Sequence, residues 1–245
     1  MSRAFIQQIK EAIDLALRQT SGSAFAAFDG DGTLWDTDMG ENFFQYQIKH
    51  SQLKGLPKDP WEHYHKLKNE VSPEVAYLWL AQINKGLPLE TIRQWAQECV
   101  DSLSPLPIFA GQKEIIDYLY KKDVQVYVVT ASIKWSVEPA ASIYGIPAER
   151  VLGVVTKIED GIVTEFQEGP ITWCQGKVDR LFLATSGTKP IFAAGNTLGD
   201  LSLLECSSHV QLAMAASSEP DDLVKKEQKL AIIAKERGWF HFCPE

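Results

Sequence analysis

The sequence predicts an α/β fold: a doubly wound, mostly parallel sheet with a small helical domain inserted into it. Three observations predict this fold. Short, nearly continuous apolar runs alternate with helical patterns, polar loops follow three of these runs, and the long segment Asp29–Asp123 separates the first run from the second. Continuous apolar runs are typical of strands buried on both faces, and their alternation with helices indicates βαβ units.

Five apolar runs are the expected strands of the sheet. They are Ala24–Phe28, Val124–Val129, Val151–Val155, Pro190–Ala194 and Val210–Met214. Helical patterns over Gln112–Lys121 and Ile133–Tyr144 flank the second run. A hairpin interrupts the alternation, because Thr156–Glu159 and Ile162–Phe166 flank Asp160-Gly161, a dipeptide favoured in two-residue type I′ turns.

The inserted domain is expected between the first two strands. The segment from Gly40 to Pro105 is mostly helical in pattern and is punctuated by Gly and Pro residues. We therefore expect a helical domain over residues 40–105 and an α/β core over residues 1–39 and 106–245. Near the end of the chain, Glu219–Arg237 predicts a charged amphipathic helix with a solvated face.

Composition excludes several classes of protein. The 245 residues are 45% hydrophobic and 23% charged, which is enough apolar material for a real core. The net charge of −8 is opposite in sign to that of a general nucleic-acid binder. The four cysteines are far apart and are expected to be reduced thiols, and no uncharged apolar stretch approaches about 18 residues. We expect a cytoplasmic protein with neither nucleic acid nor membrane as a partner, and the oligomeric state stays open.

Polar loops follow the first, second and fourth expected strands. They are Asp29–Thr33, Thr130–Ser132 and Gly195–Asp200. Because ligands of open α/β sheets bind beyond the carboxyl ends of the strands, we expect these loops to converge on one site.

The first of these loops carries two carboxylates, Asp29 and Asp31. Gly30 and Gly32 allow a turn that brings both side chains toward one ligand. Paired carboxylates repel each other and attract a cation, and oxygen donors at this density suit Mg²⁺. The alternative is an ordinary turn, because Asp-Gly-Asp-Gly is also common turn chemistry.

Four segments, in order, resemble the motifs of the haloacid dehalogenase-like phosphatase superfamily. FDGDGTLWD at residues 28–36 is similar to the DxDGT nucleophile motif, and VYVVTAS at residues 126–132 is similar to the second motif. Gly176-Lys177 resembles the third motif, and GNTLGD at residues 195–200 resembles the acidic fourth motif. An acid at Asp31 is typical of the branches that hydrolyse phosphoesters.

The resemblance implies a reaction at the two aspartates. Asp29 would attack phosphorus and form an aspartyl-phosphate that water then hydrolyses. Asp31 would protonate the leaving alkoxide and then deprotonate the water. The Mg²⁺ cofactor would be held by Asp29, the main-chain carbonyl of Asp31, and Asn196 and Asp200 of the fourth motif.

The resemblance also implies a phosphate site. The Thr130 hydroxyl, main-chain N–H groups at Gly32 and Ala131, and the Lys177 ammonium would bind the phosphoryl oxygens. Each residue also has a structural interpretation: Thr130 as a strand end, Lys177 as a solvated lysine at a helix start, and Asp200 as a helix cap.

Asn196 departs from the pattern, since many members of the superfamily have Asp there. The amide oxygen can still ligate Mg²⁺, but the site loses one negative charge. We therefore expect weaker metal affinity, and we expect Asn196→Asp to strengthen it.

The inserted domain resembles the helical cap of phosphoserine and phosphorylcholine phosphatases. Asp38, Glu41 and Arg93 are candidate substrate-binding residues. The alternatives are an exposed acidic helix start for the two acids and a surface pair with Glu90 or Gln97 for the arginine. The segment is also rich in aromatic residues, which would suit a cationic head group.

The expected function is Mg²⁺-dependent hydrolysis of a small phosphorylated metabolite, either phosphoserine-like or phosphocholine-like. One alternative is a phosphotransferase that passes the phosphoryl group of the same intermediate to an acceptor hydroxyl. Another is a non-catalytic ligand-binding protein on the same scaffold.

Overall fold

A six-stranded sheet organises the computed structural model, which describes residues 1–50, 53–217 and 222–244. The strand order is β3-β2-β1-β6-β7-β8, and every neighbouring pair is parallel. The strands are β1 (Phe25–Phe28), β2 (Gln125–Ile133), β3 (Val151–Val154), β6 (Phe192–Gly195), β7 (Val210–Met214) and β8 (Phe240–Phe242). The structure thus confirms the mostly parallel α/β fold that the sequence predicts.

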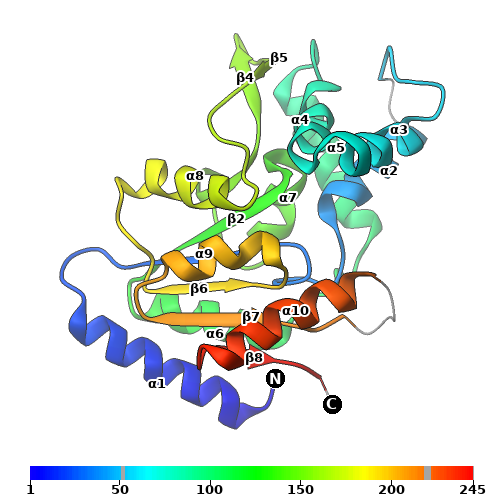
Figure 1. Ribbon diagram of the computed structural model, residues 1–245. Helices are drawn as coiled ribbons and strands as arrows, with labels where there is room; N and C mark the ends of the chain where they lie inside the picture. Colours follow the sequence, from blue (N-terminus) through cyan, green and yellow to red (C-terminus); the bar gives the residue numbers. More distant parts are fainter. Residues whose placement is uncertain (51–52, 218–221, 245) are drawn as a thin grey trace.

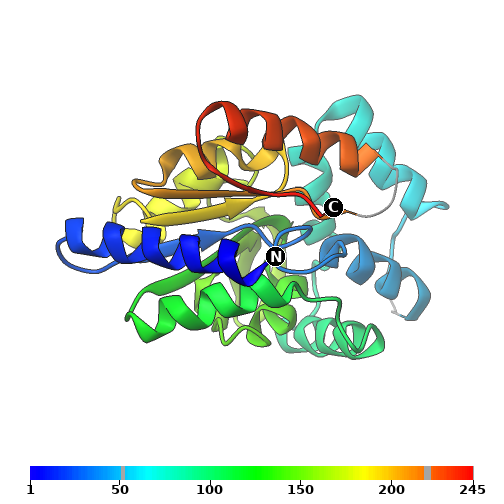
Figure 2. The same ribbon diagram turned by 90° about the horizontal axis from the view of Figure 1, so that it is seen from below.

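Helices cover both faces of the sheet, so its strands are buried on both sides (Figures 1 and 2). The first face packs against α1 (Arg3–Gln19), α6 (Ala110–Lys121) and α7 (Lys134–Ser142). The second packs against α8 (Gln175–Thr185), α9 (Leu201–Cys206) and α10 (Asp222–Glu236). Short 3₁₀ turns at Ala148–Arg150 and Leu198–Asp200 precede β3 and α9.

Between β1 and β2 the chain forms a helical group, which gathers at one end of the molecule (Figure 1). Its members are α2 (Met39–His50), α3 (Pro60–Lys66), α4 (Pro73–Gln82) and α5 (Leu89–Ser102). The sequence sets two of the helix starts, because the side chains of Asp59 and Ser72 cap α3 and α4 and a proline follows each cap. A single π-helical turn, Leu67–Val71, joins α3 to α4.

A two-stranded hairpin lies beside this helical group (Figure 1). Its strands are β4 (Thr156–Glu159) and β5 (Ile162–Gln167), and both turn residues have positive φ, as a type I′ turn requires. Three main-chain hydrogen bonds join the hairpin to the segment between α4 and α5. Gly86 and Leu89 donate to carbonyls of the hairpin, and Val163 donates back to Leu87.

The structure differs from the predicted elements at two strands. β2 continues past Val129 to Ile133 with an irregular register, so Thr130–Ser132 is an extension of the strand and not a separate loop. β8 was not expected. The cysteines at 99, 174, 206 and 243 are free thiols. Among the helices in the described ranges, none combines the length and the apolar character needed to cross a bilayer.

Candidate active site

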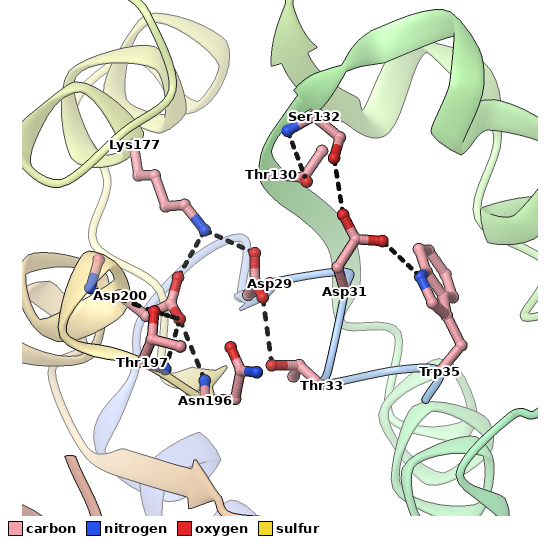
Figure 3. A network of polar contacts seen from close by, with 11 residues as sticks. Asp29, Asp31, Thr33, Trp35, Thr130, Ser132, Lys177, Asn196, Thr197 and Asp200 are labelled. Carbon is pink, nitrogen blue, oxygen red and sulfur yellow. Dashed lines mark hydrogen bonds and ion pairs between the residues drawn. The ribbon is translucent and has the colours of Figure 1, made fainter. Parts of the chain in front are cut away.

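The carboxyl ends of β1, β2 and β6 meet at one cavity of about 740 Å³. Side chains from all three strand ends line it, together with Lys177 of α8 (Figure 3). The lining includes nine of the candidate residues: Asp29, Asp31, Gly32, Asp38, Thr130, Ala131, Lys177, Asn196 and Asp200. The convergence expected for polar loops at neighbouring strand ends is therefore present in the fold.

Asp29 sits at the end of β1 and is almost fully buried. Its main-chain N–H donates to the carbonyl of Ala194 in β6 at 2.9 Å, and this bond fixes the backbone of Asp29. Its Oδ1 accepts from Lys177 Nζ at 2.6 Å, whereas Oδ2 receives only a longer bond of 3.3 Å from Thr33 Oγ1. One carboxylate oxygen is thus held by a charge, and the other is much less engaged.

Lys177 joins two carboxylates inside the protein. Its Nζ also donates to Asp200 Oδ1 at 2.5 Å, and its side chain is 2% exposed. Burial opposes the charged form, but the carboxylates of Asp200 and Asp29 raise the pKa of Lys177, so it stays an ammonium. The other oxygen of Asp200 accepts from the main-chain N–H groups of Asn196 and Thr197, which fixes this loop.

The charge balance at Asp29 is unfavourable without a further cation. Burial, and then the negative charge of Asp200, raise the pKa of Asp29 to about 7, although Lys177 opposes the shift. Lys177 contacts two carboxylates, those of Asp29 and Asp200, and the negative charge of Asp31 adds to the shift at Asp29.

Asp31 has a different environment from Asp29. Its Oδ1 accepts from Trp35 Nε1 at 2.7 Å and from the main-chain N–H of Met39 at 2.8 Å, and its Oδ2 accepts from Ser132 Oγ at 2.7 Å. Burial raises the pKa of Asp31 above its ordinary value, while these three donors lower it in part. The two aspartates therefore differ in partners: Asp29 has a cation and Asp31 has neutral donors.

Sequence reasoning missed the residues that hold Asp31. Ser132 stands in the second motif without an assigned role, and Gly40 makes room for it, because a Cβ at Gly40 would lie 2.5 Å from Ser132 Oγ. The signals were a hydroxyl two residues after Thr130 and a glycine at the start of α2. Neither identifies a partner without the fold.

Gly32 contributes through its missing side chain. Its φ of +74° favours glycine, and a Cβ there would lie 1.9 Å from Asn196 Nδ2. Its N–H donates to the carbonyl of Trp35 at 2.9 Å, so a phosphate oxygen would share or replace this bond in the role that the resemblance implies. Thr130 Oγ1 accepts from the Ser132 N–H at 3.1 Å, which leaves its own hydroxyl hydrogen to donate.

The donor set suits a hard divalent cation. Within the described residues, no group of three or more His, Cys, Asp or Glu side chains is arranged to hold a metal alone. Carboxylate oxygens of Asp29 would therefore need neutral oxygens beside them, such as the Asn196 amide oxygen and a main-chain carbonyl. Such all-oxygen sets, with surplus negative charge, fit Mg²⁺ and not a soft metal.

The helical group forms the wall of the cavity away from the sheet. Asp38, Lys68 and Tyr77 line this wall, and burial raises the pKa of Asp38 well above its ordinary value. Lys68 Nζ pairs with Glu41 at 3.0 Å and lies 5.6 Å from the ring centroid of Tyr77. Trp173, from the segment before α8, faces Tyr77 with ring centroids 5.7 Å apart.

Two candidate residues are absent from the cavity lining. Glu41 accepts from Lys68 Nζ and from the Tyr64 hydroxyl. Arg93 of α5 donates to Glu138 of α7, with Nε at 2.8 Å from Oε2. The arginine thus connects the helical group to the α/β core, and its partner is neither Glu90 nor Gln97.

The chain is similar to known proteins in sequence and in fold. The family model for haloacid dehalogenase-like hydrolases matches residues 26–205. A phosphorylcholine phosphatase of Pseudomonas aeruginosa is 26% identical over 143 residues, a match that covers 44% of this chain and 41% of that protein. The chain therefore matches less than half of the length of this relative.

Solved structures share the fold. A protein of unknown function from Bordetella pertussis Tohama I superposes with a TM-score of 0.67 at 20% identity, covering 91% of this chain and 99% of that one. A substrate-bound phosphoserine phosphatase superposes with a TM-score of 0.52 at 15% identity, covering 87% and 99%. The family match spans all three strand-end loops and Lys177, so the chain belongs to the haloacid dehalogenase-like hydrolase family.

Proposed function

We propose that the protein is a Mg²⁺-dependent phosphomonoesterase that works through an aspartyl-phosphate. The observation that carries this proposal is the contrast between the two aspartates at the end of β1. The pKa of both carboxyl groups is raised, but their partners differ: Asp29 contacts the ammonium of Lys177 and keeps one oxygen weakly engaged, whereas Asp31 accepts from three neutral donors. The reaction needs a nucleophile, which a fixed cation keeps ionised, and an acid, which neutral surroundings allow to hold a proton.

In the first step, a carboxylate oxygen of Asp29 forms a bond to phosphorus. The bond from phosphorus to the ester oxygen breaks, and Asp31 gives its proton to the departing alkoxide. In the second step, ionised Asp31 takes a proton from water, the water oxygen forms a bond to phosphorus, and the bond from phosphorus to the Asp29 oxygen breaks. This releases inorganic phosphate and restores both side chains.

Charge on the phosphoryl group is balanced by groups that are already fixed. Lys177 supplies a buried ammonium, and the Thr130 hydroxyl and the Ala131 main chain supply neutral donors at the cavity surface. Asp29, Asn196, Asp200 and the main chain of Asp31 would hold Mg²⁺. When bound, the ion supplies positive charge between the nucleophile and the phosphate.

The cavity wall favours a small substrate with charge at its far end. A volume of about 740 Å³ suits a metabolite, and we propose that residues 40–105 cap it. Relatives include a phosphorylcholine phosphatase by sequence and a phosphoserine phosphatase by fold. Because Lys68 already lies over the Tyr64 and Tyr77 rings, the cation–π position is taken by the chain itself. We therefore propose a phosphoserine-like zwitterion, with its ammonium at Asp38 and its carboxylate at Lys68, over a phosphocholine-like cation.

The test is phosphate release from a panel of small phosphomonoesters, with Mg²⁺ or with EDTA. We expect release that needs Mg²⁺ and disappears in Asp29→Asn, while Asp36→Asn, which changes an exposed aspartate at the same cavity, keeps it. Activity that survives in Asp29→Asn would contradict the nucleophile. Added alcohols that become phosphorylated would identify a phosphotransferase, and tight ligand binding without turnover would identify a binding protein.

A further inference from the structure

Glu227 is a buried acid next to the site that neither the motifs nor the proposed steps use. It lies in α10 and is 1% exposed. Its Oε1 accepts from Asn196 Nδ2 at 3.0 Å and from Ser217 Oγ at 3.1 Å, and its Oε2 accepts from the Ser217 N–H at 3.0 Å. All three partners are donors, and they hold the carboxylate in one orientation next to Asn196; burial raises the pKa of Glu227, and these donors lower it in part.

This contact decides which way the Asn196 amide faces. A side-chain amide has one donating and one accepting end, and an ionised carboxylate only accepts. The nitrogen of Asn196 must therefore face Glu227, and its oxygen lies on the side of the Asp29 carboxylate (Figure 3). The missing Cβ of Gly32 leaves room for this arrangement, since that atom would overlap Asn196 Nδ2.

The contact between Glu227 and Asn196 also affects the charge of the proposed Mg²⁺ site. Where many family members have Asp, Asn196 lacks a negative charge, and Glu227 places one directly behind the amide. We propose that Glu227 is a positioning residue of the metal site, which directs the Asn196 oxygen toward Mg²⁺ and supplies the charge that Asn196 lacks. This inference rests on the proposed Mg²⁺-dependent function.

The first experiment is calorimetric titration of Mg²⁺ alone into the wild type and Glu227→Gln. In either orientation, a glutamine amide sets one N–H group against an existing donor, at Ser217 or at Asn196. We expect Mg²⁺ affinity to fall by about 10- to 100-fold, which is the usual effect of losing an outer-shell partner. Glu236→Gln is the matched control, because it removes the same charge from an exposed position of α10. An affinity within twofold of wild type in Glu227→Gln would overturn the proposal.

A second pair of variants separates positioning from a general structural role. In Asn196→Asp, a new carboxylate faces Glu227, so the single substitution does not give the stronger binding that the sequence predicts. Adding Glu227→Gln in that background introduces an amide that can donate to the new carboxylate, and we expect Mg²⁺ binding to tighten. The effect of Glu227→Gln thus reverses sign between the two backgrounds. Equal weakening in both backgrounds would overturn the proposal. If Glu227→Gln alone is too unstable to titrate, weaker Mg²⁺ binding by the double variant than by Asn196→Asp would overturn it.

The outcomes also separate this inference from the proposed function. If the effect of Glu227→Gln on Mg²⁺ affinity reverses in this way but no ester releases phosphate, the role of Glu227 is supported and the phosphatase function is contradicted. If the wild type hydrolyses esters but binds no Mg²⁺, ester hydrolysis is supported and the role of Glu227 is overturned.

Discussion

The two ends of the cavity are built in different ways. At the sheet end, Lys177 is 2% exposed and contacts carboxylates from two different strand ends. At the helical end, Lys68 is 25% exposed and contacts Glu41 and two tyrosine rings, all of the helical group. The first arrangement is fixed by the main chain of a buried sheet, whereas the second depends on side chains from α2, α3, α4 and the π-turn.

This difference indicates that the sheet end serves catalysis and the helical end serves recognition of the substrate. Chemistry needs atoms held in place, and buried hydrogen-bonded charges at strand ends provide that rigidity. Recognition of the rest of the substrate needs only one or two groups of the right charge, which a partly exposed wall can supply.

The largest effect is expected from Asp31→Asn. An asparagine at this position cannot give up a proton, and its NH₂ group would face one or more of the three donors that now bind the carboxylate. We expect turnover of an alkyl phosphate to fall by about 10²- to 10⁴-fold, the usual contribution of general acid–base catalysis. Steady-state rates on alkyl and p-nitrophenyl phosphates check this, since the better leaving group needs less protonation. An equal loss on both esters would contradict the role of Asp31 as an acid.

Removing each lysine compares the two ends directly. Lys177→Met leaves Asp29 and Asp200 buried without their partner, and we expect it to lower the free energy of unfolding by about 3–5 kcal/mol. Lys68→Met removes a partly exposed pair and should cost roughly 0–1 kcal/mol. Urea denaturation of both variants in metal-free buffer measures the difference. Similar losses of stability for the two lysines would contradict the difference between the two ends of the cavity.

Lys68→Met is expected to change the preference between substrates more than it changes the stability of the fold. Without this ammonium, the wall keeps the acid at Asp38 and the rings of Tyr77 and Trp173. We expect the ratio of kcat/KM for phosphoserine to that for phosphocholine to fall by about tenfold, as for the loss of one hydrogen bond to a charged group. Lys54→Met, at an exposed position of the same segment, is the control. A ratio that stays constant would remove Lys68 from substrate recognition.

The smallest effect is expected from Trp35→Phe. Phenylalanine keeps the ring in the core beside Tyr144 but removes one of the three donors to Asp31. A hydrogen bond to a carboxylate contributes roughly 1.5 kcal/mol, so we expect kcat to change by about tenfold or less. Comparison with Trp61→Phe, in the helical group, separates this from a general loss of aromatic packing. A change as large as that of Asp31→Asn would show that Trp35 does more than orient the acid.

The sheet end of the cavity could be predicted from sequence because its groups follow their strands directly. A continuous apolar run locates a buried strand, and the next polar residues are then fixed at its carboxyl end. Asp29 and Asn196 are of this kind, and Thr130 follows the predicted apolar run, although β2 itself continues to Ile133. The same reasoning predicts the parallel sheet and the hairpin turn at Asp160-Gly161.

Contacts across the fold could not be predicted in this way. Glu227 is 31 residues from Asn196 on a helix whose pattern predicts a solvated face, and Arg93 meets Glu138 across 45 residues. Neither pair has a local signal, because only the packing of two elements brings the members together. β8 was missed because three residues are too few for a pattern, and the π-turn at Leu67–Val71 follows no periodicity that its sequence displays.

The hairpin β4–β5 limits which segments of the chain can be exchanged separately in a chimeric protein. Its main-chain bonds to Gly86, Leu87 and Leu89 make the segment between α4 and α5 a partner for one edge of the hairpin. A two-stranded hairpin alone is marginally stable, and an uncovered edge invites pairing with other chains. We therefore expect the exchangeable module in a chimera to be residues 40–105 together with residues 156–167. A graft of the continuous segment alone would give a protein prone to aggregation.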